Sequence, residues 1–169
     1  MRQPLHLVCG PPASGKSTYA RALGARLGAM VVDSDTATER LVRVGLAAMG
    51  ISPDDRDSAA YKAAFRELVY ATLFDLAEAN LGHLPVVIAG PFTRECADLG
   101  WPARLAERFK TTVTIYFVHA PADVRRARLV TRGEPRDAAK LAAWDAYLAT
   151  CREDPPRFPH VWVDGARGL

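Results

Sequence analysis

Residues 5–18 read LHLVCGPPASGKST, and they say more about the fold than any other part of the chain. A largely apolar pattern typical of a buried strand covers residues 5–9, and the motif G-x-x-x-x-G-K-S follows without a gap at 10–17. Alanines and leucines at helical spacing then continue as far as Leu27. A glycine-rich turn between a strand and a helix is typical of a phosphate-binding loop, so the sequence predicts one here.

The expected phosphate loop works through its backbone and two side chains. Successive N–H groups of such a loop point at one place, and the N-terminus of the following helix adds partial positive charge there. Lys16 can reach the β- and γ-phosphates of a nucleoside triphosphate, and the Ser17 hydroxyl can ligate Mg²⁺. We therefore expect ATP and Mg²⁺ as cofactors. The loop residues expected to bind ATP are Gly10, Pro12, Ala13, Ser14, Gly15, Lys16, Ser17 and Thr18.

The rest of the chain alternates between strand and helix patterns, which predicts a single α/β domain over residues 1–169 with a mostly parallel sheet. The expected strands are 5–9, 30–32, 85–89, 113–118 and 160–163. The expected helices are 17–27, 36–49, 58–80, 101–109, 123–131 and 136–151. The longest is expected to have Ser58 as its N-cap and to bury Phe65, Leu68, Val69, Leu73 and Leu76.

Composition limits the classes of protein that fit. The chain has 169 residues, of which 49% are hydrophobic and 24% charged, as in ordinary globular proteins. Its net charge of +3 is too small to indicate a nucleic-acid or membrane partner by itself. Cys9, Cys96 and Cys151 lie far apart and form no zinc-binding spacing. No apolar run reaches membrane-spanning length, and the segment before Gly10 is too short for a signal peptide, so we expect a cytoplasmic protein.

Two carboxylates, Asp33 and Asp35, stand where the second parallel strand is expected to end. Ligands bind beyond the carboxyl ends of strands in such sheets, and residues two apart in an extended segment share a face. We favour Asp35 as the base that accepts the proton of an acceptor hydroxyl, and Asp33 as its partner near the metal. The alternative is that this segment caps the next helix, and the roles are compatible. Arg40 either holds the acceptor or a phosphate, or lies on a solvated helix face.

Arginines gather in a short basic segment late in the chain. Arg125, Arg128 and Arg132 share one helix face, whereas Arg126 points away from it. A transferring phosphoryl group needs fixed positive charge, which a guanidinium supplies with a rigid fork of donors. The glycine and proline that follow mark a bend suited to a lid over ATP, expected at about 125–140. The alternative is an ordinary solvated basic face.

With these motifs in place, the chain resembles the small P-loop kinases grouped with polynucleotide kinases, zeta toxins and gluconate kinases. GPPASGKST at 10–18 is similar to the phosphate loop of that group, and DSD at 33–35 is similar to its D-x-D motif, whose second acid is the general base. The segment from Pro121 through Arg128 to Arg132 resembles its lid, whose arginines bind ATP phosphates. The resemblance implies a P-loop nucleoside triphosphate hydrolase fold, a doubly wound parallel sheet of strand order 2-3-1-4-5, and Mg²⁺-ATP as the phosphate donor.

The third expected strand departs from the pattern of that group. It reads VVIAGPF at 86–92 and has no Walker B aspartate, so metal binding is expected to depend on Ser17 and Asp33. Many members of the group have an acceptor-contacting segment at this place. Phe92 and Arg94 are therefore candidates for acceptor binding, and an ordinary loop is the alternative.

The sequence as a whole favours a kinase that moves the γ-phosphate of ATP to a hydroxyl of a small acceptor or of a nucleic-acid 5′ end. A sugar-nucleotide kinase similar to the zeta toxins is one alternative. A nucleotide-binding ATPase or switch is another, but it needs a water-positioning residue and usually a Walker B acid, and neither is found. We expect catalysis by Lys16, Asp35, Arg128 and Arg132, and acceptor binding by Asp33, Asp35, Arg40, Phe92 and Arg94 beside a helical region at about 36–80.

Overall fold

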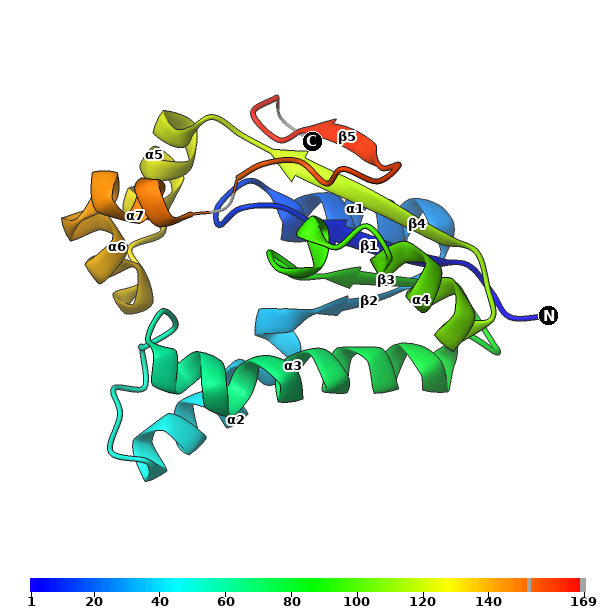
Figure 1. The fold of residues 1–169 in the computed structure, drawn as a ribbon, viewed down its shortest axis with the longest axis horizontal. Coiled ribbons are helices and arrows are strands. Elements are labelled where there is room, and N and C mark those ends of the chain that lie inside the picture. Colours follow the sequence, from blue (N-terminus) through cyan, green and yellow to red (C-terminus); the bar gives the residue numbers. More distant parts are fainter. Residues whose placement is uncertain (152, 168–169) are drawn as a thin grey trace.

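The computed structural model describes residues 1–151 and 153–167 and contains a five-stranded parallel sheet. Its strands are β1 (Leu5–Cys9), β2 (Met30–Asp33), β3 (Val86–Ala89), β4 (Val113–His119) and β5 (Val161–Asp164). They lie in the order β2-β3-β1-β4-β5 (Figure 1), which confirms the order that the resemblance implied. β1 and β3 are central because their side chains are almost all apolar and buried, as required in a sheet that is covered on both faces.

Helices connect the strands and cover both faces of the sheet (Figure 1). α1 packs on one face, and α2, α3 and α4 bury the other. Among the described residues, no helix combines the length and hydropathy needed to cross a bilayer. The helices are α1 (Lys16–Leu27), α2 (Ser34–Ala48), α3 (Ala59–Asn80), α4 (Trp101–Phe109), α5 (Ala122–Arg132), α6 (Ala138–Ala142) and α7 (Trp144–Thr150), with 3₁₀ turns η1 (Glu95–Ala97) and η2 (Pro135–Asp137).

The carboxyl ends of β1, β2 and β3 meet at one edge of the sheet. In the parallel register, Ala89 at the end of β3 pairs with Val8 of β1 on one side and with Asp33 of β2 on the other. The chain therefore enters the phosphate loop, the first turn of α2 and the turn at Gly90 at neighbouring points. Ligands of open α/β sheets bind at such an edge, so the fold brings the expected phosphate loop and carboxylates together.

The apolar face of α3 differs in part from the prediction. Ser58 is the N-cap, as expected, and Val69 and Leu73 are buried. Leu68, however, is 64% exposed and Leu76 is 37% exposed, so their predicted burial is wrong. Leucines fall on both sides of the apolar stripe in this helix, and only its packing against the sheet decides which side turns inward.

The segment that follows α5 is the main departure from the predicted elements. The sequence predicts a single helix over 136–151, but η2, α6 and α7 occupy this region, which we call the lid segment (residues 135–150). The prediction is wrong because the segment has no continuous apolar face. The buried residues of η2 and α6 are the charged Asp137 and Lys140, and none of the residues of α7, all of them described, is buried.

Candidate active site

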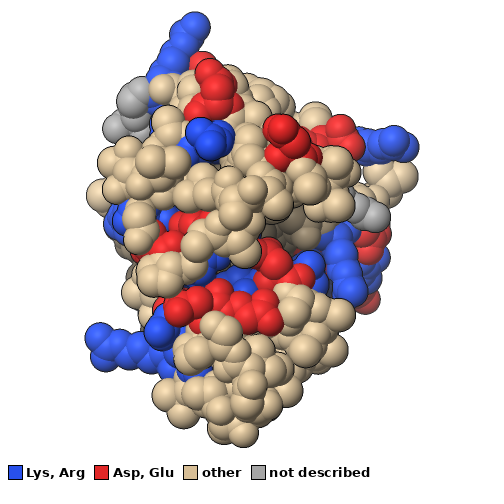
Figure 2. Space-filling model, turned by 90° about the vertical axis from the view of Figure 1, so that its left-hand side faces the viewer, with Lys and Arg blue, Asp and Glu red and all other residues tan. Residues whose placement is uncertain are grey.

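A large cleft opens at the carboxyl edge of the sheet, with a volume of about 1170 Å³. Its walls are the phosphate loop, the first turns of α2, part of α3, the turn after β3 and the lid segment. Figure 2 looks into this face and shows basic and acidic side chains gathered around the hollow. Pockets for one small ligand measure roughly 300–1,000 Å³, so the volume of this cleft lies above that range.

The phosphate loop has the backbone geometry of an anion site. Gly10, Ala13 and Gly15 have φ values of 139°, 60° and 105°. A Cβ on Gly10 would lie 2.1 Å from the carbonyl oxygen of Val118, so only glycine fits there. α1 begins at Lys16, and no side chain in the described part of the chain caps its first turn. Its first N–H groups are therefore available to phosphate oxygens.

Lys16 lies in this loop and lines the cleft. Its ammonium donates a hydrogen bond to the carbonyl oxygen of Pro11 at 2.6 Å. Burial lowers the pKa of Lys16 to about 8, although the nearby carboxylate of Asp35 acts in the opposite direction. The ammonium form therefore still predominates at neutral pH, and its charge adds to that of the helix N-terminus.

Asp33 joins the phosphate loop to α2. Its carboxylate accepts hydrogen bonds from Ser17 Oγ at 2.6 Å and from the backbone N–H groups of Asp35 and Thr36, each at 3.1 Å. Asp33 is thereby the N-cap of α2, which begins one residue later at Ser34. The sequence left open whether this segment caps the helix, and the structure assigns the cap to Asp33.

Ser17 and Asp33 supply oxygen atoms of the kind that Mg²⁺ prefers. No group of three or more His, Cys, Asp or Glu in the described part of the chain could hold a metal ion. A hydroxyl beside a carboxylate is nevertheless enough for a Mg²⁺ ion carried by ATP, because phosphate oxygens and waters complete its shell. The residues present therefore fit Mg²⁺ together with a nucleotide.

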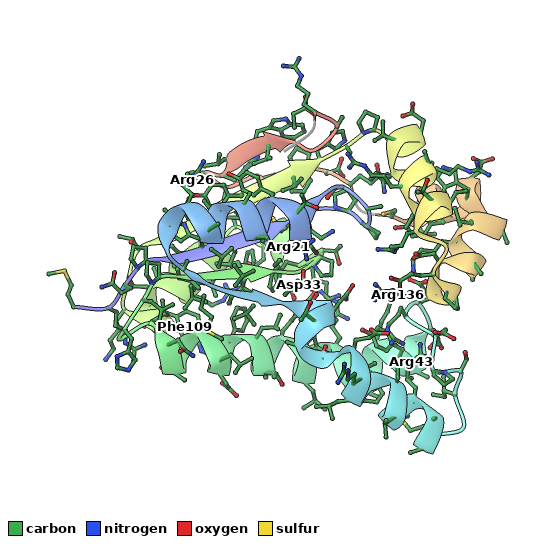
Figure 3. All side chains as sticks on the ribbon, turned by 180° about the vertical axis from the view of Figure 1, so that it is seen from behind. Arg21, Arg26, Asp33, Arg43, Phe109 and Arg136 are labelled. Carbon is green, nitrogen blue, oxygen red and sulfur yellow. The ribbon has the colours of Figure 1, made fainter. Side chains whose placement is uncertain are left out.

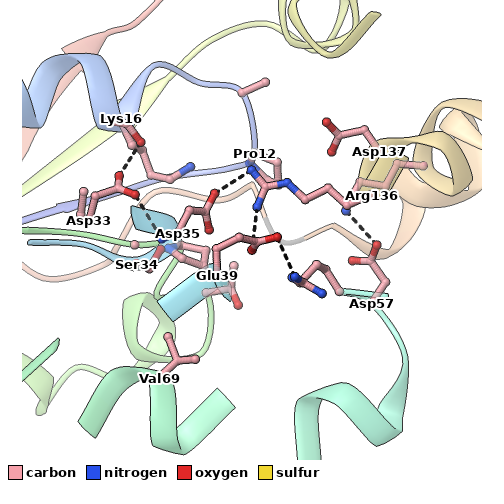
Figure 4. A pocket seen from close by; sticks show the side chains of 18 of the residues that line it. Pro12, Lys16, Asp33, Ser34, Asp35, Glu39, Asp57, Val69, Arg136 and Asp137 are labelled. Carbon is pink, nitrogen blue, oxygen red and sulfur yellow. Dashed lines mark hydrogen bonds and ion pairs between the residues drawn. The ribbon is translucent and has the colours of Figure 1, made fainter. Parts of the chain in front are cut away.

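Asp35 lies in the first turn of α2, faces the cleft, and has a side chain that is 58% exposed. Its carboxylate pairs with Arg136 of η2 at 2.9 Å, and Arg136 also contacts Glu39 at 3.4 Å (Figure 4). Seen from behind in Figure 3, Arg136 reaches from the lid segment toward the strand ends where Asp33 lies. The carboxylate is thus open to a ligand, and the lid segment compensates its charge.

One further ion pair joins the lid segment to the loop before α3, and another joins that loop to α2. Lys140 pairs with Asp57 at 2.8 Å, and Arg56 pairs with Glu39 at 2.8 Å. All four residues line the cleft, but the sequence analysis did not single them out as site residues. The sequence does contain acidic and basic clusters, and nothing in it shows which members of those clusters meet in space.

The structure places two acceptor candidates away from the cleft. Phe92 is fully buried, and its ring lies 4.7 Å from Tyr70, 6.1 Å from Phe74 and 5.3 Å from Trp101. Arg40 is exposed and does not belong to the cleft lining. We correct both assignments: Phe92 anchors the turn after β3 in the core, and Arg40 lies on the solvated face of α2.

Buried Phe92 nevertheless positions one wall of the cleft. It has a φ of 44°, and its N–H donates to the Tyr70 hydroxyl at 3.2 Å. Thr93 and Arg94, the next two residues, line the cleft, and Arg94 pairs loosely with Glu67 at 3.7 Å. Arg94 therefore stays a candidate for acceptor binding, and buried Phe92 holds the turn that carries it.

Replacing Tyr70 with phenylalanine is expected to lower the free energy of unfolding by about 1–3 kcal/mol, because the N–H of Phe92 would be left without its acceptor in the core. Urea denaturation measures this change. Tyr19→Phe is the matched control, since the Tyr19 hydroxyl makes no hydrogen bond within the described residues. An equal loss in both variants would show that the Tyr70 hydroxyl does not hold the turn.

The arginines of α5 have different roles. Arg125 is fully buried, donates to the carbonyl oxygen of Ala120 at 3.1 Å and pairs with Glu153. Its expected place on the phosphate-facing stripe is therefore wrong, because its side chain is enclosed by the protein and does not line the cleft. Arg126 is exposed, as predicted.

Arg128 and Arg132 both line the cleft, as expected. Arg128 donates to the carbonyl oxygens of Ala13 at 3.1 Å and Gly165 at 2.6 Å. Arg132 donates from Nε to Asp137 at 2.9 Å. Both guanidinium groups are thus bound by other protein atoms.

A family model described as an AAA domain matches residues 5–154. The chain belongs to this AAA domain family. The match covers the phosphate loop, both carboxylates and the lid segment, and it confirms the resemblance to small P-loop kinases that the sequence motifs indicated.

Curated relatives of this AAA domain include a shikimate kinase of Paracidovorax citrulli, 42% identical over 77 residues, which are 46% of this chain and 38% of that protein. An uncharacterised protein of Mycobacterium tuberculosis is 32% identical over 146 residues, which are 82% of this chain and 28% of that protein. The chain therefore spans less than half the length of these relatives.

Solved structures with the same fold include a putative kinase from Chloroflexus aurantiacus, with a TM-score of 0.68 and 23% identity, covering 97% of this chain and 89% of that one. A sugar kinase from a Janibacter species has a TM-score of 0.60 and 16% identity, covering 99% of this chain and 88% of that one. At these identities the likeness establishes the fold of the AAA domain and no more.

Proposed function

We propose that the protein is a kinase that transfers the γ-phosphate of Mg²⁺-ATP to a hydroxyl group of a small acceptor. The observation that carries the proposal is that two complementary features share one cleft. The uncapped start of α1 and the Lys16 ammonium suit a triphosphate, and the accessible carboxylate of Asp35 suits removal of a hydroxyl proton.

The described residues divide the reaction between them. Lys16 and the loop N–H groups bind the phosphates, and Arg132 stabilises the negative charge of the transferring group. Asp35 accepts the proton of the acceptor hydroxyl as the new P–O bond forms, and the bond to the ADP oxygen breaks. Mg²⁺, when bound beside Ser17 and Asp33, supplies further charge neutralisation on the phosphates.

The acceptor we propose is a small hydroxylated molecule rather than a nucleic-acid end. Relatives and neighbours include a shikimate kinase and a sugar kinase by name. Three basic side chains of the cleft, Arg56, Arg136 and Lys140, already pair with carboxylates of the same cleft. Pairing of this kind leaves little of the continuous positive charge that tracks a nucleic-acid backbone.

We also propose residues 1–169 as a single kinase domain, with the acceptor wall within about 36–80 and the lid at about 125–140. The lid segment (residues 135–150) overlaps the end of this range and continues it to Thr150. Support comes from the lining of the cleft, to which both regions contribute. A nucleotide-binding switch remains the second candidate.

Transfer of radiolabelled γ-phosphate tests the proposal directly. We expect label on one class among shikimate, gluconate, simple sugars, sugar nucleotides and antibiotics, and none on oligonucleotides with 5′-hydroxyl ends. ATP hydrolysis without transfer to any acceptor would instead favour the switch.

A further inference from the structure

The phosphate loop contains an unusual backbone position at Ala13. This residue has a φ of 60°, in the left-handed region. Such a conformation costs alanine conformational free energy that glycine does not incur, because its Cβ approaches the following carbonyl oxygen. Within the loop, Ser14 N donates to Pro11 O at 3.3 Å and the Lys16 ammonium donates to the same carbonyl at 2.6 Å, while the buried Ser14 hydroxyl has no partner in the described part of the chain. None of these bonds involves the Ala13 carbonyl, whose contact comes from outside the loop.

Arg128 makes that contact from another part of the chain. Its Nη1 donates to the carbonyl oxygen of Ala13 at 3.1 Å, and its Nη2 donates to the carbonyl oxygen of Gly165 at 2.6 Å. A guanidinium is a rigid planar fork, so the two bonds fix one carbonyl relative to the other. One donor of the expected phosphate-binding arginine is thus used on the loop itself, and another on the segment after β5.

Gly165 is a firm anchor for the second bond. Its N–H donates to the carbonyl oxygen of His119 at the end of β4, at 2.7 Å. A Cβ on Gly165 would lie 2.0 Å from the carbonyl oxygen of Ser14, so this segment packs directly against the phosphate loop. Arg128 therefore connects the loop to the end of the sheet.

We propose that Arg128 is a positioning residue that holds Ala13 in its left-handed conformation, so that the loop N–H groups are preorganised for the β-phosphate before a nucleotide binds. The inference deepens the proposed function and rests on it for the identity of the ligand. Preorganisation raises affinity because the loop pays no ordering cost on binding. A residue that touched the γ-phosphate instead would distinguish ATP from ADP.

Calorimetry with Mg²⁺-ADP and Mg²⁺-ATP separates these roles. We expect Arg128→Ala to weaken both nucleotides by the same factor, about tenfold, as the loss of charge-assisted hydrogen bonds within the protein predicts. A lysine can donate to only one of the two carbonyls at a time, so the nucleotide affinities of Arg128→Lys should lie between those of the natural protein and of Arg128→Ala. The matched control is Arg126→Ala on the exposed side of the same helix. A loss confined to ATP would overturn the proposal and make Arg128 a γ-phosphate ligand.

A second background tests the backbone argument. Glycine at position 13 adopts the left-handed conformation freely, so Arg128→Ala should weaken ADP binding several-fold less in an Ala13→Gly background than in the natural one. Equal losses in the two backgrounds would contradict the inference. Thermal unfolding of each variant checks that global stability does not explain the difference.

Hydrogen exchange of the ligand-free protein gives a readout that needs no nucleotide. Arg128→Ala should accelerate exchange across the phosphate loop while leaving β3 unchanged. Unchanged exchange in the loop would overturn the positioning role. Absence of any nucleotide binding by the natural protein, with accelerated loop exchange in the variant, would leave the positioning role standing and remove the kinase proposal.

Discussion

Replacing Lys16 with alanine is expected to reduce turnover by roughly 10³-fold or more, because the variant loses the ammonium that neutralises the β- and γ-phosphates as charge shifts between them. The effect is large since this ammonium lies in the loop itself, partly shielded from water, where burial has already lowered its pKa to about 8. Initial rates of phosphate transfer at saturating ATP measure the loss.

The matched control for this experiment is Lys62→Ala. Lys62 also lines the cleft, from α3, so its removal changes the charge of the cleft by the same amount without touching the loop. A comparable fall in rate for both variants would mean that overall charge, and not the position of Lys16, accounts for the effect.

Replacing Asp35 with asparagine is expected to lower kcat by about 10²- to 10⁴-fold, the usual contribution of a general base. The affinity for Mg²⁺-ATP should change little, because Asp33 both caps α2 and contacts Ser17, and the substitution leaves Asp33 in place. Single-turnover rates and nucleotide affinities, measured on the same variant, separate the two quantities.

Asp57→Asn serves as the comparison for Asp35→Asn. Asp57 lines the same cleft and pairs with Lys140, but it lies in the loop before α3 and not at a strand end. If Asp35→Asn lost ATP affinity and rate equally, its carboxylate would belong to the nucleotide site and the assignment as base would be abandoned.

The sequence was sufficient to predict the parallel sheet and the position of the phosphate loop. Apolar runs such as Leu5–Cys9 and Val86–Ala89 are typical of the interior strands of a sheet that is covered on both faces. The loop motif then indicates the edge of the sheet at which ligands bind. Asp33 and Asp35 could be placed for the same reason, since Asp33 is the last residue of a strand that ends at that edge and Asp35 follows it.

The side chains that failed the prediction depend on contacts between distant segments. Phe92 follows a strand and could equally have faced the cleft, but the aromatic rings of α3 and α4 bury it. Arg125 and Arg128 lie on the same side of α5, but their side chains leave the helix in slightly different directions. Arg125 is therefore buried against Ala120, whereas Arg128 reaches the phosphate loop. The sequence shows that Arg136 is basic, but only the folded structure shows that it forms an ion pair with Asp35.

The lid segment is attached to the rest of the molecule by charged side chains and not by an apolar face. The strength of this attachment should therefore depend on ionic strength, since the electrostatic screening length falls from about 10 Å at 0.1 M salt to about 3 Å at 1 M. Salt weakens such ion pairs and leaves burial in the sheet intact or stronger. We therefore expect the cleft to widen as salt concentration rises, while the sheet and its covering helices stay folded.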